Sequence, residues 1–263
     1  MDRLDGKSAV VIGADGKLGP IWIEALFEAG ATVTALCEPG RAPSDRLKSL
    51  IDTASGQIRL GSCDVSDPDS VQSARDAVIA DVGAIDVLVV NAGIDTPPGA
   101  TATWALGEFP VALMRRILEV NVIGAFNVMQ VFSTSMLPGG SVIAVGSMYG
   151  SSAPMATLYD HIETEPAFLK PPAYGASKSA LSNLVNWLAV HWAPTGLRFN
   201  TLSPGGVAGG QDPEFIRKFS ATVPMHRLCE PEELKGPLLF LASDASSYIT
   251  GSELLVDGGR HAW

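Results

Sequence analysis

Short β-branched segments alternate with longer helical patterns along the whole chain, and this alternation restricts the fold more than any other feature. The segments that predict strands are 8–12, 32–36, 58–63, 87–91, 141–145, 198–202 and 253–256. Those that predict helices are 21–28, 67–81, 111–136, 173–191 and 231–243. Several strands are apolar throughout, which is typical of strands that helices cover on both faces. The alternation favours right-handed βαβ connections, and therefore an α/β fold with a doubly wound, mostly parallel, seven-stranded sheet.

Length and composition favour a single domain over residues 1–263. Of these residues 46% are hydrophobic, and no Pro-, Gly- or Ser-rich linker divides them. The net charge of −10 argues against nucleic acid or an anionic membrane as a partner, and no apolar stretch is long enough to span a bilayer. The three cysteines are odd in number and, like the four histidines, lack metal-ligand spacing. We therefore expect reduced thiols, a cytoplasmic location and no metal site.

A glycine-rich turn follows the first predicted strand and precedes the first predicted helix. Its candidate cofactor-binding residues are Gly13, Asp15, Gly16, Lys17, Leu18 and Gly19. Glycines at such a turn let the backbone approach a pyrophosphate, whose charge then faces the helix N-terminus. A glycine cluster by itself also suits a tight turn. Its placement here favours a Rossmann-type site for a dinucleotide, NAD or NADP.

Glu38, at the end of the second strand, bears on the choice between these two dinucleotides. A carboxylate there accepts hydrogen bonds from the adenine ribose hydroxyls and repels a 2′-phosphate, which favours NAD. Lys17 and Arg41 argue in the other direction, because either could neutralise such a phosphate. The sequence therefore favours NAD without excluding NADP.

Two further strand ends carry candidate cofactor contacts. Asp64-Val65 follows the third strand, where the carboxylate is placed to accept a hydrogen bond from the adenine amino group. Capping the helix that begins near Asp67-Pro68 is the alternative role for Asp64. Asn91-Ala92-Gly93 closes the fourth strand. These small residues leave room for a cofactor ribose, and Asn91 could also lock the turn.

Tyr174 and Lys178 are four residues apart in a predicted helix, so their side chains lie on one face. A free phenol titrates near pH ~10 and exchanges protons poorly at neutral pH. The ammonium of Lys178 is expected to lower that pKa by stabilising the phenolate. Ser147 ends a buried strand at the edge where open α/β sheets bind ligands. Its hydroxyl could bond the substrate oxygen that Tyr174 protonates, although an isolated Ser often only begins a turn.

In this combination, the chain resembles the short-chain dehydrogenase/reductase family. The resemblance covers nearly the whole chain and rests on the glycine turn, Asn91-Ala92-Gly93, Asn121, Ser147, Tyr174-x-x-x-Lys178, Pro204-Gly205 and Val256-Asp257-Gly258-Gly259. It implies hydride transfer between nicotinamide C4 and an alcohol or carbonyl carbon of a small-molecule substrate, with Tyr174 as the acid/base. It also implies a homotetramer or homodimer.

The resemblance implies further residue roles. Ser147 would hold the substrate oxygen, and Lys178 would bind the nicotinamide ribose. Asn121 would hold a water molecule that relays protons through Lys178; a buried Asn that kinks a long helix is the alternative. After Pro204-Gly205, the backbone near Val207 would contact the carboxamide of nicotinamide.

Three departures from the family pattern stand out. In the glycine turn, Ile12 and Lys17 replace the usual Thr and middle Gly, and Gly16 is offset by one position, as in sugar-nucleotide epimerases and dehydratases. Gly209 stands where many relatives carry a Thr. Ser147 and Tyr174 are 27 positions apart instead of about a dozen, so an insertion at about 151–172 must loop out between them.

The insertion leaves and returns beside the two catalytic residues, so we expect it to overhang the substrate pocket, with a glycine-rich substrate loop at about 205–227 on the other side. Its polar content favours a sugar or another polyhydroxylated substrate, and capping of a neighbouring subunit is the alternative. The sequence thus predicts an NAD(P)-dependent oxidoreductase that interconverts a secondary alcohol and a ketone. A redox-neutral sugar-nucleotide epimerase or dehydratase and a non-catalytic nucleotide-binding protein are the rival hypotheses.

Overall fold

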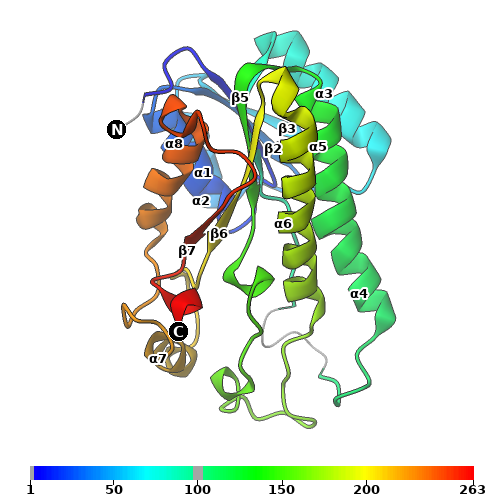
Figure 1. Cartoon of the computed structure of the whole chain (residues 1–263), viewed down its shortest axis with the longest axis vertical. Helices are drawn as coiled ribbons and strands as arrows, with labels where there is room; N and C mark the ends of the chain where they lie inside the picture. Colours follow the sequence, from blue (N-terminus) through cyan, green and yellow to red (C-terminus); the bar gives the residue numbers. More distant parts are fainter. Residues whose placement is uncertain (1–2, 97–102) are drawn as a thin grey trace.

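The computed structural model describes residues 3–96 and 103–263. A seven-stranded sheet, with strand order β3-β2-β1-β4-β5-β6-β7, lies between two layers of helices (Figure 1). All neighbouring strands run parallel. The strands are β1 Ser8–Ile12, β2 Thr32–Cys37, β3 Ile58–Ser62, β4 Ile85–Val90, β5 Met136–Val145, β6 Arg198–Pro204 and β7 Glu253–Val256. The predicted doubly wound Rossmann-type α/β fold is confirmed.

Helices cover both faces of this sheet. One layer holds α1 Gly19–Glu28, α2 Asp45–Thr53 and α8 Lys235–Ala242; the other holds α3 Pro68–Val82, α4 Val111–Leu118, α5 Ala125–Ser133 and α6 Ala173–Trp192. Trp22 and Leu26 of α1 fill the first interface, and Val78, Phe132 and Val185 fill the second. Apolar strands buried on both faces explain why the sheet segments read as continuous hydrophobic runs.

The predicted helix at 111–136 is wrong in its continuity and its end. A π-helical segment, Glu119–Gly124, separates α4 from α5, and the chain already enters β5 at Met136. Met136 pairs with Ile85 of β4, so a contact with a distant strand overrides the local helical pattern.

Two helices were not predicted. Helix α2 buries only Leu47, and α7 Pro213–Ala221 buries only Phe219, although Ser44 and Asp212 cap their N-termini. The predicted helix at 231–243 consists of the 3₁₀ turn Pro231–Leu234 followed by α8. Other short 3₁₀ turns are Met148–Gly150, Ala156–Leu158, Ala193–Thr195, Asp244–Ser246 and Arg260–Ala262.

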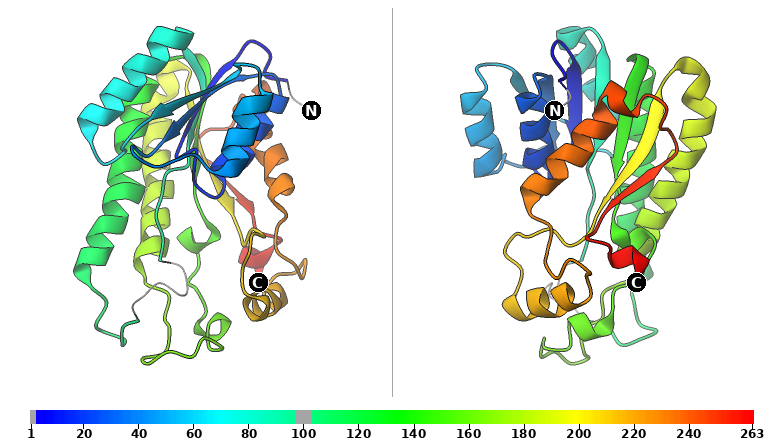
Figure 2. Two further views of the ribbon diagram at one scale, coloured as in Figure 1. Left: turned by 180° about the vertical axis from the view of Figure 1, so that it is seen from behind. Right: turned by 60° about the vertical axis from the view of Figure 1, so that its left-hand side comes forward.

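The topology places a ligand cleft at one end of the sheet. Strand β1 lies between β2 and β4, so the connections from β1 and β4 diverge to opposite sides at their carboxyl ends. The segments that follow β5 and β6 extend beyond this same end, as does the C-terminus (Figure 2). Within 3–96 and 103–263, no helix has the length and apolar character needed to cross a membrane.

Candidate active site

A cavity of about 870 Å³ opens at the carboxyl ends of the strands. The predicted cofactor residues in its wall are Gly16, Lys17, Leu18, Asn91, Gly93, Tyr174, Lys178, Pro204, Gly205 and Val207. Ser147 lies in the same wall. The insertion contributes Tyr159, His161, Ile162 and Lys170, and the substrate loop contributes Gln211, Asp212, Phe215 and Phe219. The structure therefore places the predicted cofactor-binding residues, the insertion and the substrate loop around one cavity.

The glycine turn is shaped by close backbone contacts. Gly13 has φ +76°, and a Cβ atom there would lie 2.6 Å from the backbone of Ala92. A Cβ atom on Gly19 would lie 2.3 Å from the carbonyl oxygen of Ala14. These glycines hold a tight turn against β4 and the start of α1, and Gly16, Lys17 and Leu18 border the cavity. This arrangement fits the pyrophosphate of a dinucleotide.

Asn91 locks this turn, as one of its two predicted roles requires. Its Nδ2 donates to the carbonyl oxygen of Gly13 at 2.7 Å, and its Oδ1 accepts from Nε1 of the buried Trp22 at 2.8 Å. Ala92 packs directly on Gly13. The cofactor-ribose contact expected of this segment stays a prediction, although Asn91 and Gly93 do border the cavity.

Lys17 reaches across the cavity towards the substrate loop. Its Nζ lies 3.4 Å from the carbonyl oxygen of Val207, and a Cβ atom on Gly209 would lie 2.6 Å from its Cε. Two departures from the family pattern, a Lys at the middle Gly and a Gly at the Thr, thus meet in space. The small residue at 209 makes room for the lysine side chain.

The side chains of Asp15 and Glu38 face Arg41, and neither residue lines the cavity. The buried Asp15 carboxylate is 2.7 Å from Nε of Arg41, and the exposed Glu38 is 3.8 Å from the same guanidinium. Arg41 is therefore flanked by two carboxylates. This ion-pair cluster sits beyond β2, where a cofactor's adenine ribose is predicted.

Asp64 is not the cap of α3, so that alternative is wrong. Asp67 takes this position and accepts from the backbone N–H of Asp69 at 3.0 Å. The Asp64 carboxylate instead accepts from the N–H and hydroxyl of Ser66, at 2.9 and 2.6 Å. Val65 is buried, and a Cβ atom on Gly124 would lie 2.7 Å from its side chain. Adenine contacts by Asp64 and Val65 stay predictions.

The predicted catalytic residues Ser147, Tyr174 and Lys178 converge on the cavity. Ser147 follows β5, while Tyr174 and Lys178 come from the first turns of α6. The Lys178 ammonium lies 5.7 Å from the centroid of the Tyr174 ring and donates to the carbonyl oxygen of Val145 at 2.7 Å. Ser147 also accepts from the N–H of Tyr149 at 3.2 Å, so it begins a turn as well.

The predicted lowering of the Tyr174 pKa is wrong. Enclosure of the phenol raises its pKa to about 12, the negative charge of Asp95 adds to the rise, and a hydrogen bond with Ser147 opposes it. Burial likewise lowers the pKa of Lys178 to about 8, against the attraction of Asp95. For both groups withdrawal from water is the largest cause of the pKa shift, because the ionised form loses its hydration on burial.

Asn121 lies in the π-helical segment and does not border the cavity. Its Oδ1 accepts from the N–H of Ile94 at 2.8 Å, and its Nδ2 donates to the carbonyl oxygen of Ile94 at 2.9 Å and to the hydroxyl of Ser177 at 3.0 Å. The side chain thus ties the α4–α5 junction to the segment after β4 and to α6. The irregular helix agrees with the structural alternative, and the water relay stays a prediction.

The insertion and the substrate loop are joined by aromatic and charged contacts. The Tyr159 ring stacks on Phe215 at 5.7 Å and meets the edge of Phe168 at 5.3 Å. Lys218 of α7 forms an ion pair with Asp160, and His161 Nε2 lies 3.0 Å from Asp212. The contacts of Tyr159, Asp160 and His161 join the insertion to the substrate loop, and both segments contribute residues to the cavity wall.

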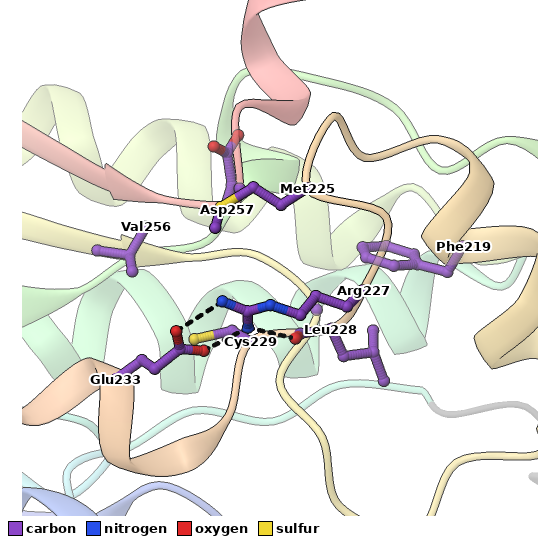
Figure 3. A pocket seen from close by; sticks show the side chains of 10 residues that line it. Phe219, Met225, Arg227, Leu228, Cys229, Glu233, Val256 and Asp257 are labelled. Carbon is purple, nitrogen blue, oxygen red and sulfur yellow. Dashed lines mark hydrogen bonds and ion pairs between the residues drawn. The ribbon is translucent and has the colours of Figure 1, made fainter.

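A second, smaller cavity of about 80 Å³ lies behind the end of the substrate loop (Figure 3). Arg227 spans it, forming an ion pair with Glu233 and donating to the carbonyl oxygen of Leu228 at 3.1 Å. Glu233 also accepts from the N–H of Glu230 at 2.8 Å. These contacts fasten the returning end of the loop to the 3₁₀ turn before α8.

Sequence reasoning missed several cavity residues, chiefly Asp95, Tyr149 and Phe215. Asp95 comes four residues after Asn91, just beyond the carboxyl end of β4. This position was the sequence feature that could have identified it as a cavity residue. Phe215 belongs to the helix that the sequence did not reveal. Within the described residues, no three His, Cys, Asp or Glu side chains cluster as metal ligands.

Comparison with known proteins decides the family. A family model described as Enoyl-(Acyl carrier protein) reductase matches residues 19–261. D-arabinitol 2-dehydrogenase (ribulose-forming) of Candida tropicalis is 31% identical over 284 residues, covering 99% of this chain and 94% of that protein. A short-chain type dehydrogenase/reductase from Mycobacterium marinum is 33% identical, with a TM-score of 0.79 over 98% of this chain and 96% of that chain. This chain belongs to the short-chain dehydrogenase/reductase family.

A further solved relative shows the cofactor chemistry of such proteins. Gluconate 5-dehydrogenase from Burkholderia cenocepacia, in complex with NADP and tartrate, has a TM-score of 0.84 at 28% identity, covering 99% of this chain and 97% of that chain. The family member described here is an NAD(P)-dependent oxidoreductase that interconverts a secondary alcohol and a ketone. The redox-neutral and non-catalytic alternatives are not favoured, since these relatives are named as dehydrogenases.

Proposed function

We propose that this dehydrogenase/reductase acts on a polyol and the corresponding ketose, with NAD as its preferred cofactor. The observation that carries the proposal is the convergence of Ser147, Tyr174 and Lys178 on a cavity to which the insertion adds polar side chains among apolar ones. These polar side chains are His161 and Lys170, and the insertion is proposed to cover the substrate. The names of the relatives that act on D-arabinitol and gluconate support a polyhydroxylated substrate.

The proposed proton chemistry belongs to Tyr174. In the reducing direction its phenol, protonated because its pKa is about 12, donates a proton to the carbonyl oxygen of the substrate. Ser147 donates a hydrogen bond to the same oxygen, where negative charge develops. Lys178 holds its positive charge beside the ring and balances the phenolate that remains. Bound NAD(P) supplies or accepts the hydride.

The preference for NAD is supported by the charges around Arg41. Its guanidinium is already paired with Asp15 and lies close to Glu38, so the cluster has a surplus of negative charge. A 2′-phosphate would add to that surplus, whereas ribose hydroxyls can donate to the Glu38 carboxylate. The gluconate 5-dehydrogenase relative was crystallised with NADP. Comparing kcat/KM for NAD and NADP therefore tests this choice directly.

A homo-oligomer is also proposed, supported by apolar side chains left exposed on α4, the π-helical segment and α6. Val111 is 63% exposed, Ile123 53%, Trp187 54% and Val190 70%. The packing of α4 against α6 brings these helices together on one side of the molecule. We further propose a cytoplasmic location, supported by three cysteines that are all free thiols.

The Tyr174→Phe variant tests the proposed chemistry. The phenol is the only group assigned to give or take the substrate proton, so kcat should fall by about 10²- to 10⁴-fold. NAD affinity, measured by calorimetric titration, should change little, because the ring remains. Tyr248→Phe, at a fully exposed tyrosine, serves as the matched control. If Tyr174→Phe retains activity close to that of the control with every alcohol turned over, the assigned acid/base is wrong.

A further inference from the structure

Lys170, near the end of the insertion, forms an ion pair with Asp95 in the cavity wall. Its side chain is only 7% exposed, and that of Asp95 is 35% exposed. The ammonium lies 5.7 Å from the centroid of the Tyr174 ring. Tyr174 therefore has two cations near its ring, Lys178 one helical turn after it and Lys170 in the segment before α6.

The Lys170 ammonium has one more donor than its protein partners use. Two of its three N–H groups are accounted for by Asp95 Oδ2 and by the carbonyl oxygen of Thr96, which is 3.2 Å away. Among residues 3–96 and 103–263, no acceptor for the third is found. Lys170 lines the cavity, so a ligand atom there can accept the hydrogen bond of this third donor.

Asp95 supplies acceptor positions beside this donor. Its Oδ1 accepts from the N–H of Thr96 at 2.7 Å, and its Oδ2 accepts from Lys170. A carboxylate offers about four acceptor positions, so lone pairs remain for a ligand. The pair thus presents a donor and an acceptor side by side, which matches a hydroxyl, since a hydroxyl both accepts and donates.

The charge of the pair selects between ligand classes. Lys170 and Asp95 neutralise one another, so the pair itself offers no net positive charge to hold a carboxylate or a phosphate. An anionic group on the substrate would also meet the Asp95 carboxylate, which repels it. A neutral hydroxyl meets neither penalty.

We propose that Asp95 and Lys170 form a specificity-determining pair that binds a substrate hydroxyl one or two carbons from the reacting carbon. The enzyme then selects neutral polyols over both simple secondary alcohols and sugar acids. This inference rests on the proposed function and deepens it, because it names the residues that recognise the additional hydroxyl. In this proposal, the insertion places Lys170 beside the substrate hydroxyl.

Two alcohols with the same five-carbon chain test the pair: D-arabinitol, which carries neighbouring hydroxyls, and 2-pentanol, which does not. The measurement is kcat/KM for each with saturating NAD. Lys170→Met and Asp95→Asn should each lower kcat/KM for arabinitol by about 10- to 100-fold, since a site built for a hydroxyl loses its partner. The value for 2-pentanol should change less than about threefold, because that substrate never reaches the pair.

Lys7→Met is the matched control. It removes an ion pair with Asp86 at the amino ends of β1 and β4, where neither residue lines the cavity, and should leave the arabinitol/2-pentanol ratio unchanged. Lys170→Met could instead lower kcat/KM equally for both substrates, or shift the pH profile of both alike. The pair would then affect only the structure of the site or Tyr174, and the inference is overturned. The same holds if the wild-type enzyme prefers gluconate to arabinitol. Turnover of 2-pentanol alone would overturn this inference but leave the oxidoreductase chemistry intact, whereas turnover of neither alcohol would refute both.

Discussion

The burial of Lys178 makes a prediction about stability that is independent of any substrate. Withdrawal from water lowers the pKa of this ammonium from 10.5 to about 8. Between these two pH values, the unfolded chain keeps a proton that the folded protein has lost. The unfolded state therefore binds more protons, and the free energy of unfolding rises with pH across this window. Below about pH 8 the folded protein bears the full cost of burying the charge.

The size of this gain follows from the two pKa values. Between pH 7 and pH 9.5, the linkage relation gives a rise of about 2 kcal/mol from Lys178 alone. Lys178→Met keeps most of the side-chain volume and removes the titrating group. The free energy of unfolding of the wild type, minus that of the variant, should therefore increase by about 2 kcal/mol over this range.

Urea unfolding followed by tryptophan fluorescence measures the difference. Protein concentration is held constant and NAD is omitted, since ligands and assembly both shift apparent stability. The series stops at pH 9.5, before Tyr174 begins to ionise. Lys48→Met, at a lysine whose side chain is 54% exposed, provides the control and should show no such rise. A wild-type minus Lys178→Met difference that stays constant to within about 0.5 kcal/mol would refute the argument that burial governs this lysine.

Two further predictions concern packing and assembly. Asn121→Ala removes both hydrogen bonds to the backbone of Ile94 and the one to Ser177. It should lower the free energy of unfolding by about 2–4 kcal/mol and the Tm in a thermal scan by about 5–15 °C. An unchanged Tm would show that these hydrogen bonds do not stabilise the fold. Val190→Glu places a charge on the apolar surface of α6, so light scattering should show a smaller assembly than for the wild type; equal masses would exclude α6 from the interface.

Local pattern was enough to predict the sheet and the helix that carries Tyr174 and Lys178. Strands β1 and β7 have the predicted bounds, because short apolar runs bounded by turns leave little choice of position. The spacing of Tyr174 and Lys178 likewise places both on one face of α6, whatever the rest of the chain does. Helix α7 was missed although Asp212 caps it and Phe215, Ile216 and Phe219 lie in one apolar cluster. This cluster packs on the insertion and not on the sheet.

What the sequence by itself determined was the α/β class, the glycine turn and the identities of Ser147, Tyr174 and Lys178, since each depends on order and spacing along the chain. Only the tertiary structure decided that Asp95 and Lys170, 75 positions apart, meet beside Tyr174. It also decided the direction of the Tyr174 and Lys178 pKa values. Both outcomes depend on which groups share a space with little water, and that enclosure arises only when distant segments pack together.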